Sequence, residues 1–194
     1  MRTLPTVTLA LLASVFTAQE ALAEVETYVL EKPHTQIIFG TKHLGFTTSY
    51  GRFHEFDGGF TFDRANPENS SAEATIQTAS IDMGTKPWDD HMKNQDFFHV
   101  TKFPTMTFKS TNIEMTGENT ANITGNLTIL EKTHPVTLAT TFNHSGEQPF
   151  DKKYHAGFSA TGTLNRTDWG MDYGVAVGVG DVVELIIEVD GIRQ

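Results

Sequence analysis

The residues whose types and spacing could support chemistry are concentrated in the run DDHMKNQDFFHV, from Asp89 to Val100. His91 and His99 lie in this run among several acids, and a loop could fold imidazole and carboxylate groups around zinc or copper at about 2.0–2.2 Å. The same run holds two adjacent phenylalanines, which favour an apolar cover. In that case the histidines hydrogen-bond the backbone of their own segment. We favour the apolar cover and keep a metal-binding or metal-dependent protein using His91 and His99 as the alternative.

Other catalytic patterns are absent from the sequence. The chain has no cysteine, which excludes thiol catalysis, thiolate metal sites and haem attachment. None of its eight histidines lies two or four residues from another. The glycine-rich run GVAVGVGD, residues 174–181, does not open a helix after a parallel strand, so a phosphate-binding loop is not expected. We therefore expect no enzyme activity, no catalytic residues and no cofactor.

The amino terminus has the layout of a secretory signal. Met1 and Arg2 precede the apolar run VTLALLASVFTA, and ALA at residues 21–23 precedes Glu24. We expect cleavage after Ala23, a mature domain of residues 24–194, and export to the periplasm. The net charge of −10 makes binding to nucleic acid a poor hypothesis, because the phosphate backbone selects basic surfaces.

Most of the mature chain alternates apolar and polar residues with a period of two, which is typical of half-buried β-strands. Gly and Pro separate the runs, and we find no repeat and no linker. Eight antiparallel strands of this kind can close into a barrel or stack as a sandwich, and the alternation alone leaves both open. The predicted strands are residues 36–43, 51–62, 72–81, 104–111, 121–130, 136–142, 154–164 and 182–189.

The inward positions of these strands mix small and large residues. Twelve of 33 assigned inward positions are Gly, Ala, Ser or Thr, which leaves space inside. The space could be a ligand cavity, or large and small side chains could interdigitate to fill a tapered barrel. The large inward residues are Ile37, Phe39, Phe56, Phe60, Phe62, Met106, Phe108, Leu138, Phe142, Phe158, Leu164, Leu185 and Ile187.

The two predicted ends of the sheet differ in composition. One set of connections is polar and acidic, with Phe150 as its single aromatic residue. The other set gathers aromatic residues, including both tryptophans. There we predict that Asp89 or Asp90 caps a short helix running from His91 towards Phe97. This segment would turn its apolar side chains inward across the barrel mouth, either as a simple plug or as a lid over a ligand.

Several runs together resemble the YceI-like family of exported polyisoprenoid-binding proteins. They are HTQIIFGTKHLGF, GRFHEFDGGFTFD, DDHMKNQDFFHVTKFPTMTFKS, GFSATGTLNRTDWGM and VGDVVELIIEV, and they span nearly the whole mature domain. The chain departs from the family pattern at Met92, where Leu is usual, and at Trp169, where Phe is usual. The resemblance implies an all-β, eight-stranded antiparallel up-and-down barrel of the lipocalin type, with a short helical lid segment between its third and fourth strands.

The resemblance also implies a ligand, namely a polyisoprenoid or quinone-type lipid held in the barrel and carried through the periplasm. Each exposed CH₂ of such a chain costs roughly 0.8 kcal/mol in water, so an apolar tube is an adequate carrier. Transient membrane contact to load the lipid and a homodimer are further expectations. His43, near the mouth, could meet a polar head group or a neighbouring carbonyl. The predicted ligand-binding residues are Phe39, His43, Phe60, Phe62, Trp88, His91, Phe97, Phe98, Met106, Phe108, Leu138, Phe142, Phe158, Trp169 and Leu185.

Overall fold

A computed structural model describes residues 25–194, and the expected signal peptide lies outside these described residues. This part of the chain forms eleven strands and one short α-helix, α1 (Lys86–Met92). The strands are β1 (Glu26–Leu30), β2 (Gln36–His43), β3 (Thr47–Phe53), β4 (Phe56–Phe62), β5 (Ser71–Gln77), β6 (Ile81–Asp82), β7 (Thr105–Met115), β8 (Thr120–Ile129), β9 (Lys132–Glu147), β10 (Tyr154–Asn165) and β11 (Val179–Arg193).

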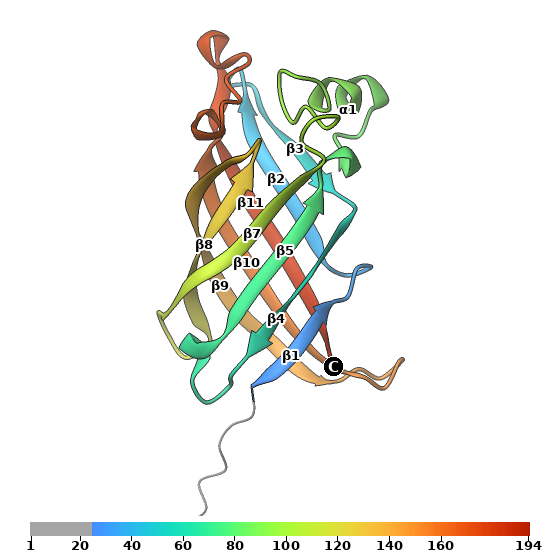
Figure 1. The fold of residues 1–194 in the computed structure, drawn as a ribbon, viewed down its shortest axis with the longest axis vertical. Helices are drawn as coiled ribbons and strands as arrows, with labels where there is room; N and C mark the ends of the chain where they lie inside the picture. The colour runs from blue at the N-terminus through green and yellow to red at the C-terminus, as the bar shows by residue number, and fades with distance from the viewer. Residues whose placement is uncertain (1–24) are drawn as a thin grey trace, which may run out of the picture.

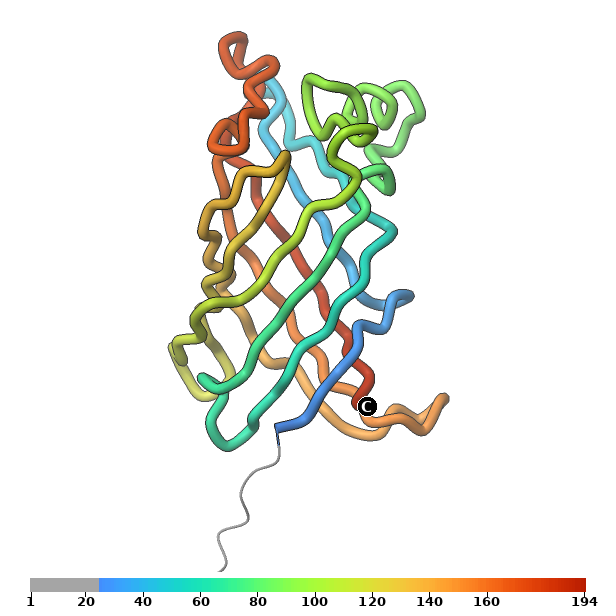
Figure 2. The backbone as a smooth tube through the Cα atoms, in the orientation of Figure 1, coloured from blue at the N-terminus to red at the C-terminus, as the bar shows by residue number. Residues whose placement is uncertain are grey.

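The eleven strands form a closed antiparallel barrel with eight strand positions around its wall, which we call barrel strands, shown in Figure 1 and Figure 2. Three barrel strands are each made of two segments: β1 continues into β2, β3 into β4, and β5 into β6. The barrel closes where the first barrel strand pairs with the last. There β2 pairs with the earlier part of β11, and β1 pairs with the final residues of β11. The pairing confirms the up-and-down barrel and excludes the sandwich.

The alternation of apolar and polar residues determines which face of each barrel strand is buried. In β9, Val136, Leu138 and Thr140 are buried, while Thr137 and Ala139 between them are exposed. Such strands can bury one face only, and closing the sheet encloses that face without leaving an unpaired edge.

One inward glycine is required by close packing. A Cβ atom on Gly125 in β8 would lie 2.3 Å from the ring of Phe108 in β7, so the phenyl ring occupies the place of the missing side chain. A larger residue there would displace this ring, which is itself one of the predicted ligand-binding residues.

The two ends of the barrel carry different structures. We call the lid end the one that bears α1, the β2–β3 turn and residues 166–178, and Figure 1 shows these segments together at the top. The opposite end carries the β4–β5, β7–β8 and β9–β10 connections and both described termini. Phe150, in the β9–β10 connection, is 91% exposed there. The predicted difference between the ends is therefore present in the structure.

Both predicted bounds of the helix were wrong, because the helix was expected to run from His91 towards Phe97 and α1 ends at Met92. The helix α1 begins at Lys86, with Pro87 in its first turn, where the missing N–H of proline costs nothing. Asp89 and Asp90 lie inside it. The Oδ1 of Asp89 accepts a hydrogen bond from the backbone N–H of Met83 at 2.7 Å, and Asp90 pairs with Lys86 one turn earlier at 2.6 Å. Both acids therefore have other partners than the helix amino terminus.

Within residues 25–194, none of the helices has the length and apolar character that crossing a membrane demands.

Candidate functional site

The inside of the barrel contains a cavity of about 580 Å³. It is lined by inward side chains from all eight barrel strands. Among them are small residues such as Ala74, Thr140 and Ala160, which leave the space open. The interior is therefore not completely filled by interdigitating side chains. Fourteen of the fifteen predicted ligand-binding residues line this cavity: Phe39, His43, Phe60, Phe62, Trp88, His91, Phe97, Phe98, Met106, Phe108, Leu138, Phe142, Phe158 and Leu185.

Four phenyl rings form an aromatic floor towards the opposite end of the barrel. Phe158 makes edge-to-face contacts with Phe60 and Phe62 at ring-centroid distances of 5.3 and 5.4 Å, and Phe142 lies 5.4 Å from Phe158. Tyr28 of β1, which is almost fully buried, stacks on Phe60 at 4.7 Å. Edge-to-face and offset arrangements are the preferred geometries of aromatic pairs, so these contacts stabilise the floor of the cavity.

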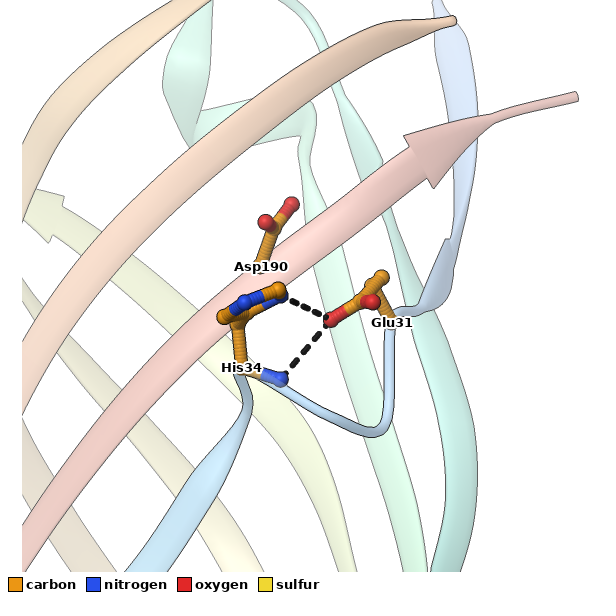
Figure 3. A group of neighbouring side chains, drawn as sticks. All are labelled: Glu31, His34 and Asp190. Atoms are coloured by element: carbon orange, nitrogen blue, oxygen red, sulfur yellow. Dashed lines mark hydrogen bonds and ion pairs between the residues drawn. The ribbon is translucent and has the colours of Figure 1, made fainter. Parts of the chain in front are cut away.

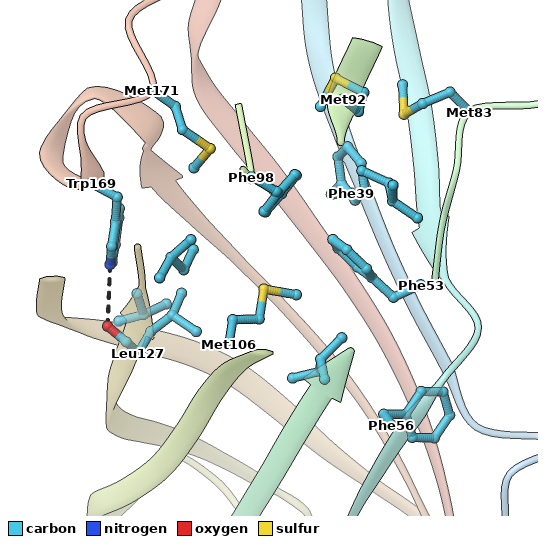
Figure 4. Packing of buried hydrophobic residues seen from close by; sticks show 14 of the residues in the cluster. Phe39, Phe53, Phe56, Met83, Met92, Phe98, Met106, Leu127, Trp169 and Met171 are labelled. Carbon is cyan, nitrogen blue, oxygen red and sulfur yellow. Dashed lines mark hydrogen bonds between the residues drawn. The ribbon is translucent and has the colours of Figure 1, made fainter. Parts of the chain in front are cut away.

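The lid segment, which is α1 together with the chain between α1 and β7, covers the other end with apolar side chains. Met92, at the end of α1, and Phe98 are both buried and line the cavity, and Figure 4 shows them with the inward rings of β2 and β3. The ring of Phe98 meets Phe53 edge to face at 5.4 Å, and Phe53 lies 5.5 Å from Phe39. The inward orientation of the predicted lid residues is thus present, although the helix bearing Met92 starts earlier than expected.

Trp169 is the predicted residue that the structure places elsewhere. It lies in the short 3-10 helix η3 (Arg166–Trp169), is 1% exposed, and does not line the cavity. Its indole N–H donates to the carbonyl of Leu127 at 3.3 Å, the dashed line in Figure 4, and its ring meets that of His134 at 5.0 Å. The indole therefore anchors the loop after β10 to the strand pair β8–β9.

A buried arginine at the lid end was missed by the sequence analysis. Arg166 lines the cavity and is 4% exposed, and its guanidinium lies 5.9 Å from the ring of Phe97. It donates to the carbonyls of Gly180, Met171 and Tyr173 at 2.8, 2.7 and 2.9 Å. Burial lowers the pKa of the guanidinium, although an arginine in a protein keeps its charge.

Strand parity could have identified this residue. Arg166 follows Leu164 at an interval of two and therefore continues the inward face of β10 beyond its last residue. Its carbonyl partners belong to the chain between Met171 and Gly180, so the guanidinium organises the loop that forms one side of the lid end. It also places a positive charge in the cavity wall at the lid end.

The histidines of the lid segment lie in aromatic surroundings. His91 lines the cavity, and its ring meets Phe97 and Tyr173 edge to face at 5.1 and 5.0 Å, while its Nε2 lies 3.6 Å from a carboxylate oxygen of Asp96. His99 packs against Phe103 at 5.7 Å. Among residues 25–194, the one group of three candidate metal ligands that lie close together contains neither histidine. The alternative metal hypothesis therefore gains no geometric support at this place.

Large apolar side chains are exposed around the lid end. Phe46 in the β2–β3 turn is 83% exposed and Val177 in the loop before β11 is 74% exposed. The two turns adjoin, because the backbone N–H of Leu44 donates to the carbonyl of Gly178 at 3.1 Å. We call Leu44, Phe46 and Val177 the apolar rim.

Comparison with known proteins places this architecture in a family. Residues 28–190 match the YceI-like domain. The UPF0312 protein PA0423 of Pseudomonas aeruginosa (strain PAO1) is 43% identical over 188 residues, which is 96% of both chains. A UPF0312 protein of Azotobacter vinelandii is 40% identical over 190 residues, again 96% of both chains.

Solved structures agree on the fold. The crystal structure of Burkholderia cenocepacia BcnA superposes with a TM-score of 0.75 at 26% identity, covering 83% of this chain and 98% of that one. A polyisoprenoid binding domain from Saccharophagus degradans superposes with a TM-score of 0.66 at 11% identity, over 88% of this chain and all of that one, and this likeness shows the fold alone. Because the match spans nearly all of the described residues and the relatives align over almost their full length, the chain belongs to the YceI-like domain family.

Proposed function

We propose that this protein binds a long-chain polyisoprenoid or similar apolar lipid inside the barrel and carries it through the periplasm. The observation that carries the proposal is the cavity of about 580 Å³, lined mostly by apolar side chains, with aromatic rings towards one end and the lid segment at the other. Nothing in this function requires catalysis.

The chemistry of the wall suits a hydrocarbon. A chain of many isoprene units is insoluble, since each CH₂ exposed to water costs roughly 0.8 kcal/mol. A cavity lined by aliphatic and aromatic side chains removes this cost, whereas a polar ligand would lose its hydration without compensating hydrogen bonds. The Saccharophagus domain, described as polyisoprenoid binding, suggests the ligand class to test.

Polar side chains line the cavity at both ends, with Arg64, Glu118 and Asn119 at the opposite end, and the group at the lid end is where we place a lipid head group. His91 and Arg166 line the cavity there, and His43 lies at the end of β2. We propose that the lipid enters tail first, with its tail on the aromatic floor and its head beside these side chains. A quinone or a prenyl phosphate would both offer oxygen acceptors to them.

We propose further that the apolar rim touches the membrane while the lipid is loaded. Phe46 and Val177 are exposed beside the lid, where they could enter the interfacial region of a bilayer. Export of the chain, cleavage after Ala23 and a homodimer remain predictions. Cell fractionation, amino-terminal sequencing and analytical ultracentrifugation of the processed chain would test them.

The direct test is native mass spectrometry of the mature protein purified without detergent, followed by lipid extraction. We expect a bound prenyl lipid, or stoichiometric uptake of an added prenyl quinone. A chain recovered empty that also fails to take up the quinone contradicts the proposal.

Matched variants connect the binding to the cavity. Ala160 lines the cavity in β10, and its neighbour Thr161 is exposed on the outer face of the same strand. Ala160→Phe should fill the cavity and abolish uptake, whereas Thr161→Phe adds the same ring outside and should bind like the wild type. Equal binding by both variants would place the lipid outside the barrel.

A further inference from the structure

We propose that Glu31, His34 and Asp190 form a binding site for a divalent transition metal such as zinc on the outer wall of the barrel. Glu31 and His34 lie in the connection between β1 and β2, and Asp190 lies near the end of β11. Inward positions of β11, such as Leu185 and Ile187, line the cavity, and Asp190 has the opposite parity. The site is therefore separate from the lipid cavity.

The three side chains already converge. Their candidate ligand atoms all lie within 4.8 Å of one another. Figure 3 shows Glu31 joined to His34 by hydrogen bonds and Asp190 beside them, with its carboxylate turned away from the pair. The Nδ1 of His34 lies 3.0 Å from Oε2 of Glu31. In a tetrahedral site with bonds of about 2.0–2.2 Å, the donor atoms lie roughly 3.3–3.6 Å apart. Small side-chain movements therefore suffice, and the His34 side chain, which is 71% exposed, is free to make them.

The backbone beneath the site is held in place. The N–H of Glu31 donates to the carbonyl of Asp190 at 2.7 Å, and the N–H of Thr35 donates to the carbonyl of Glu31 at 3.1 Å. The hydroxyl of Thr35 also bonds to the carbonyl of Asp190 at 3.2 Å. The two segments that supply the ligands are thus joined before any metal binds, which lowers the entropy cost of assembling the site.

A neighbouring histidine orients one of the carboxylates. The Nδ1 of His155 lies 2.6 Å from Oδ1 of Asp190, and its Nε2 lies 3.2 Å from Asp151. Hydrogen-bonded carboxylates of this kind are usual among metal ligands, because the outer partner fixes their orientation. The second oxygen of Asp190 remains for the metal.

The charge and the donor set favour a transition metal. Glu31 and Asp190 bring two carboxylates together, while Lys32 in the same connection turns to Asp57, with its Nζ 2.6 Å from Oδ1. A divalent cation would neutralise the two carboxylates. One imidazole nitrogen and two carboxylate oxygens suit zinc, whereas calcium prefers six to eight oxygen ligands.

The position of the site suggests a structural role. Pairing of β1 with β11 closes the ring through three residue pairs, Tyr28 with Arg193, Val29 with Ile192 and Leu30 with Gly191. A metal held by Glu31, His34 and Asp190 would join the amino-terminal strands to β11 at this seam. Because the three ligands come together only in the folded chain, binding would stabilise the closed barrel.

The test is equilibrium dialysis of zinc against the mature, chelator-treated protein, with calcium in parallel. We expect one zinc per chain, no saturable calcium binding, and slower hydrogen exchange of the β1 amides with zinc. His34→Ala should weaken zinc binding about tenfold or more, the least that a direct ligand should contribute. The control His144→Ala changes an exposed histidine of β9 outside the group and should bind as the wild type does.

Two results would overturn the site: zinc binding that does not saturate, or equal affinity in the His34→Ala and His144→Ala variants. Asp190→Asn provides a second ligand variant if one is needed, because it keeps the size of the side chain. Lipid occupancy measured on the same samples should not change with zinc. Failure of lipid binding would therefore leave the zinc result standing, and the reverse also holds.

Discussion

At the scale of single residues, Trp169 shows that an aromatic residue near a cavity can serve the fold alone. The indole is 1% exposed, bonds to Leu127 and packs on His134 without lining the cavity. We predict that Trp169→Ala lowers the free energy of unfolding by about 3–5 kcal/mol, the usual cost of a large cavity in a core. Urea unfolding would measure this loss.

The same variant separates stability from binding. Because Trp169 does not line the cavity, lipid affinity per folded molecule should be unchanged under conditions where the variant stays folded. A stable Trp169→Ala variant with impaired lipid binding would instead restore the tryptophan to the binding site, as the sequence had suggested.

Asp82 gives a residue-scale prediction about acid stability. Its pKa is lowered to about 2 by the hydrogen bond with His54, with further contributions from the Gly84 N–H and Arg52. Because the folded pKa lies below the unfolded value, the ionised carboxylate stabilises the fold above about pH 4, and this contribution is lost as the pH falls towards 2.

Thermal unfolding from pH 7 to pH 2 tests this contribution. Asp82→Asn should melt below the wild type at pH 7, and the difference should shrink as the pH falls from about 4 to about 2. A difference that stays constant across this range would mean that the ionised carboxylate is not its source.

At the scale of elements, the lid segment is held on the barrel in part by the ring of Phe98. Phe98 is buried against Phe53, whereas Trp88 on the same segment is 38% exposed. We predict that Phe98→Ala loosens the lid and speeds release of a bound prenyl lipid by roughly tenfold, the factor that corresponds to about 1.4 kcal/mol. Stopped-flow exchange of a fluorescent prenyl analogue would measure the rate.

A suitable control is Phe150→Ala, which removes a ring that is 91% exposed at the opposite end. Its release rate should equal that of the wild type. If release is unchanged in Phe98→Ala as well, the segment is a static plug, and the lipid leaves by another route.

Strand parity explains why most elements could be predicted from the sequence. Alternation such as that of residues 136–140 reports which face is buried, and burial is what decides a half-buried strand. The strand β1 was not predicted, and the breaks between β3 and β4 and between β5 and β6 were not foreseen. The strand β1 depends on pairing with β11, and β6 on pairing with β3, which lie far away in the sequence.

The same reasoning explains which predictions about the site differ from the structure. Inward positions of the strands were identified because their parity is local, and ten of the fourteen predicted residues that line the cavity lie on strands. The start of α1 was misplaced because Asp89 bonds to Met83 and Asp90 to Lys86, contacts that composition does not reveal. The sequence could not show that Trp169 lies off the cavity, because a loop has no parity from which to tell cavity from core.

At the scale of the whole molecule, the lid segment and the apolar rim lie at the same end of the barrel, together with His91 and Arg166 of the cavity wall. If that end docks on a membrane, Phe46→Ser should slow lipid transfer from vesicles about tenfold, since burying a phenyl side chain contributes about 1.5–3 kcal/mol. Phe150→Ser, at the opposite end, should transfer lipid at the wild-type rate. Equal slowing in both variants would mean that docking has no preferred end.

The net charge of −10 sets the conditions under which such docking can occur. An acidic protein is repelled by anionic lipids, and the repulsion is screened over about 10 Å at 0.1 M salt. We predict that transfer from vesicles rich in an anionic phospholipid is slow at low salt and accelerates as salt is added, whereas transfer from zwitterionic vesicles changes little. A rate that falls with salt on anionic vesicles would instead reveal a basic docking patch and shift the contact away from the apolar rim. Because the charge acts on approach and the rim acts after contact, Phe46→Ser should lower the rate at every salt concentration while leaving its dependence on salt unchanged.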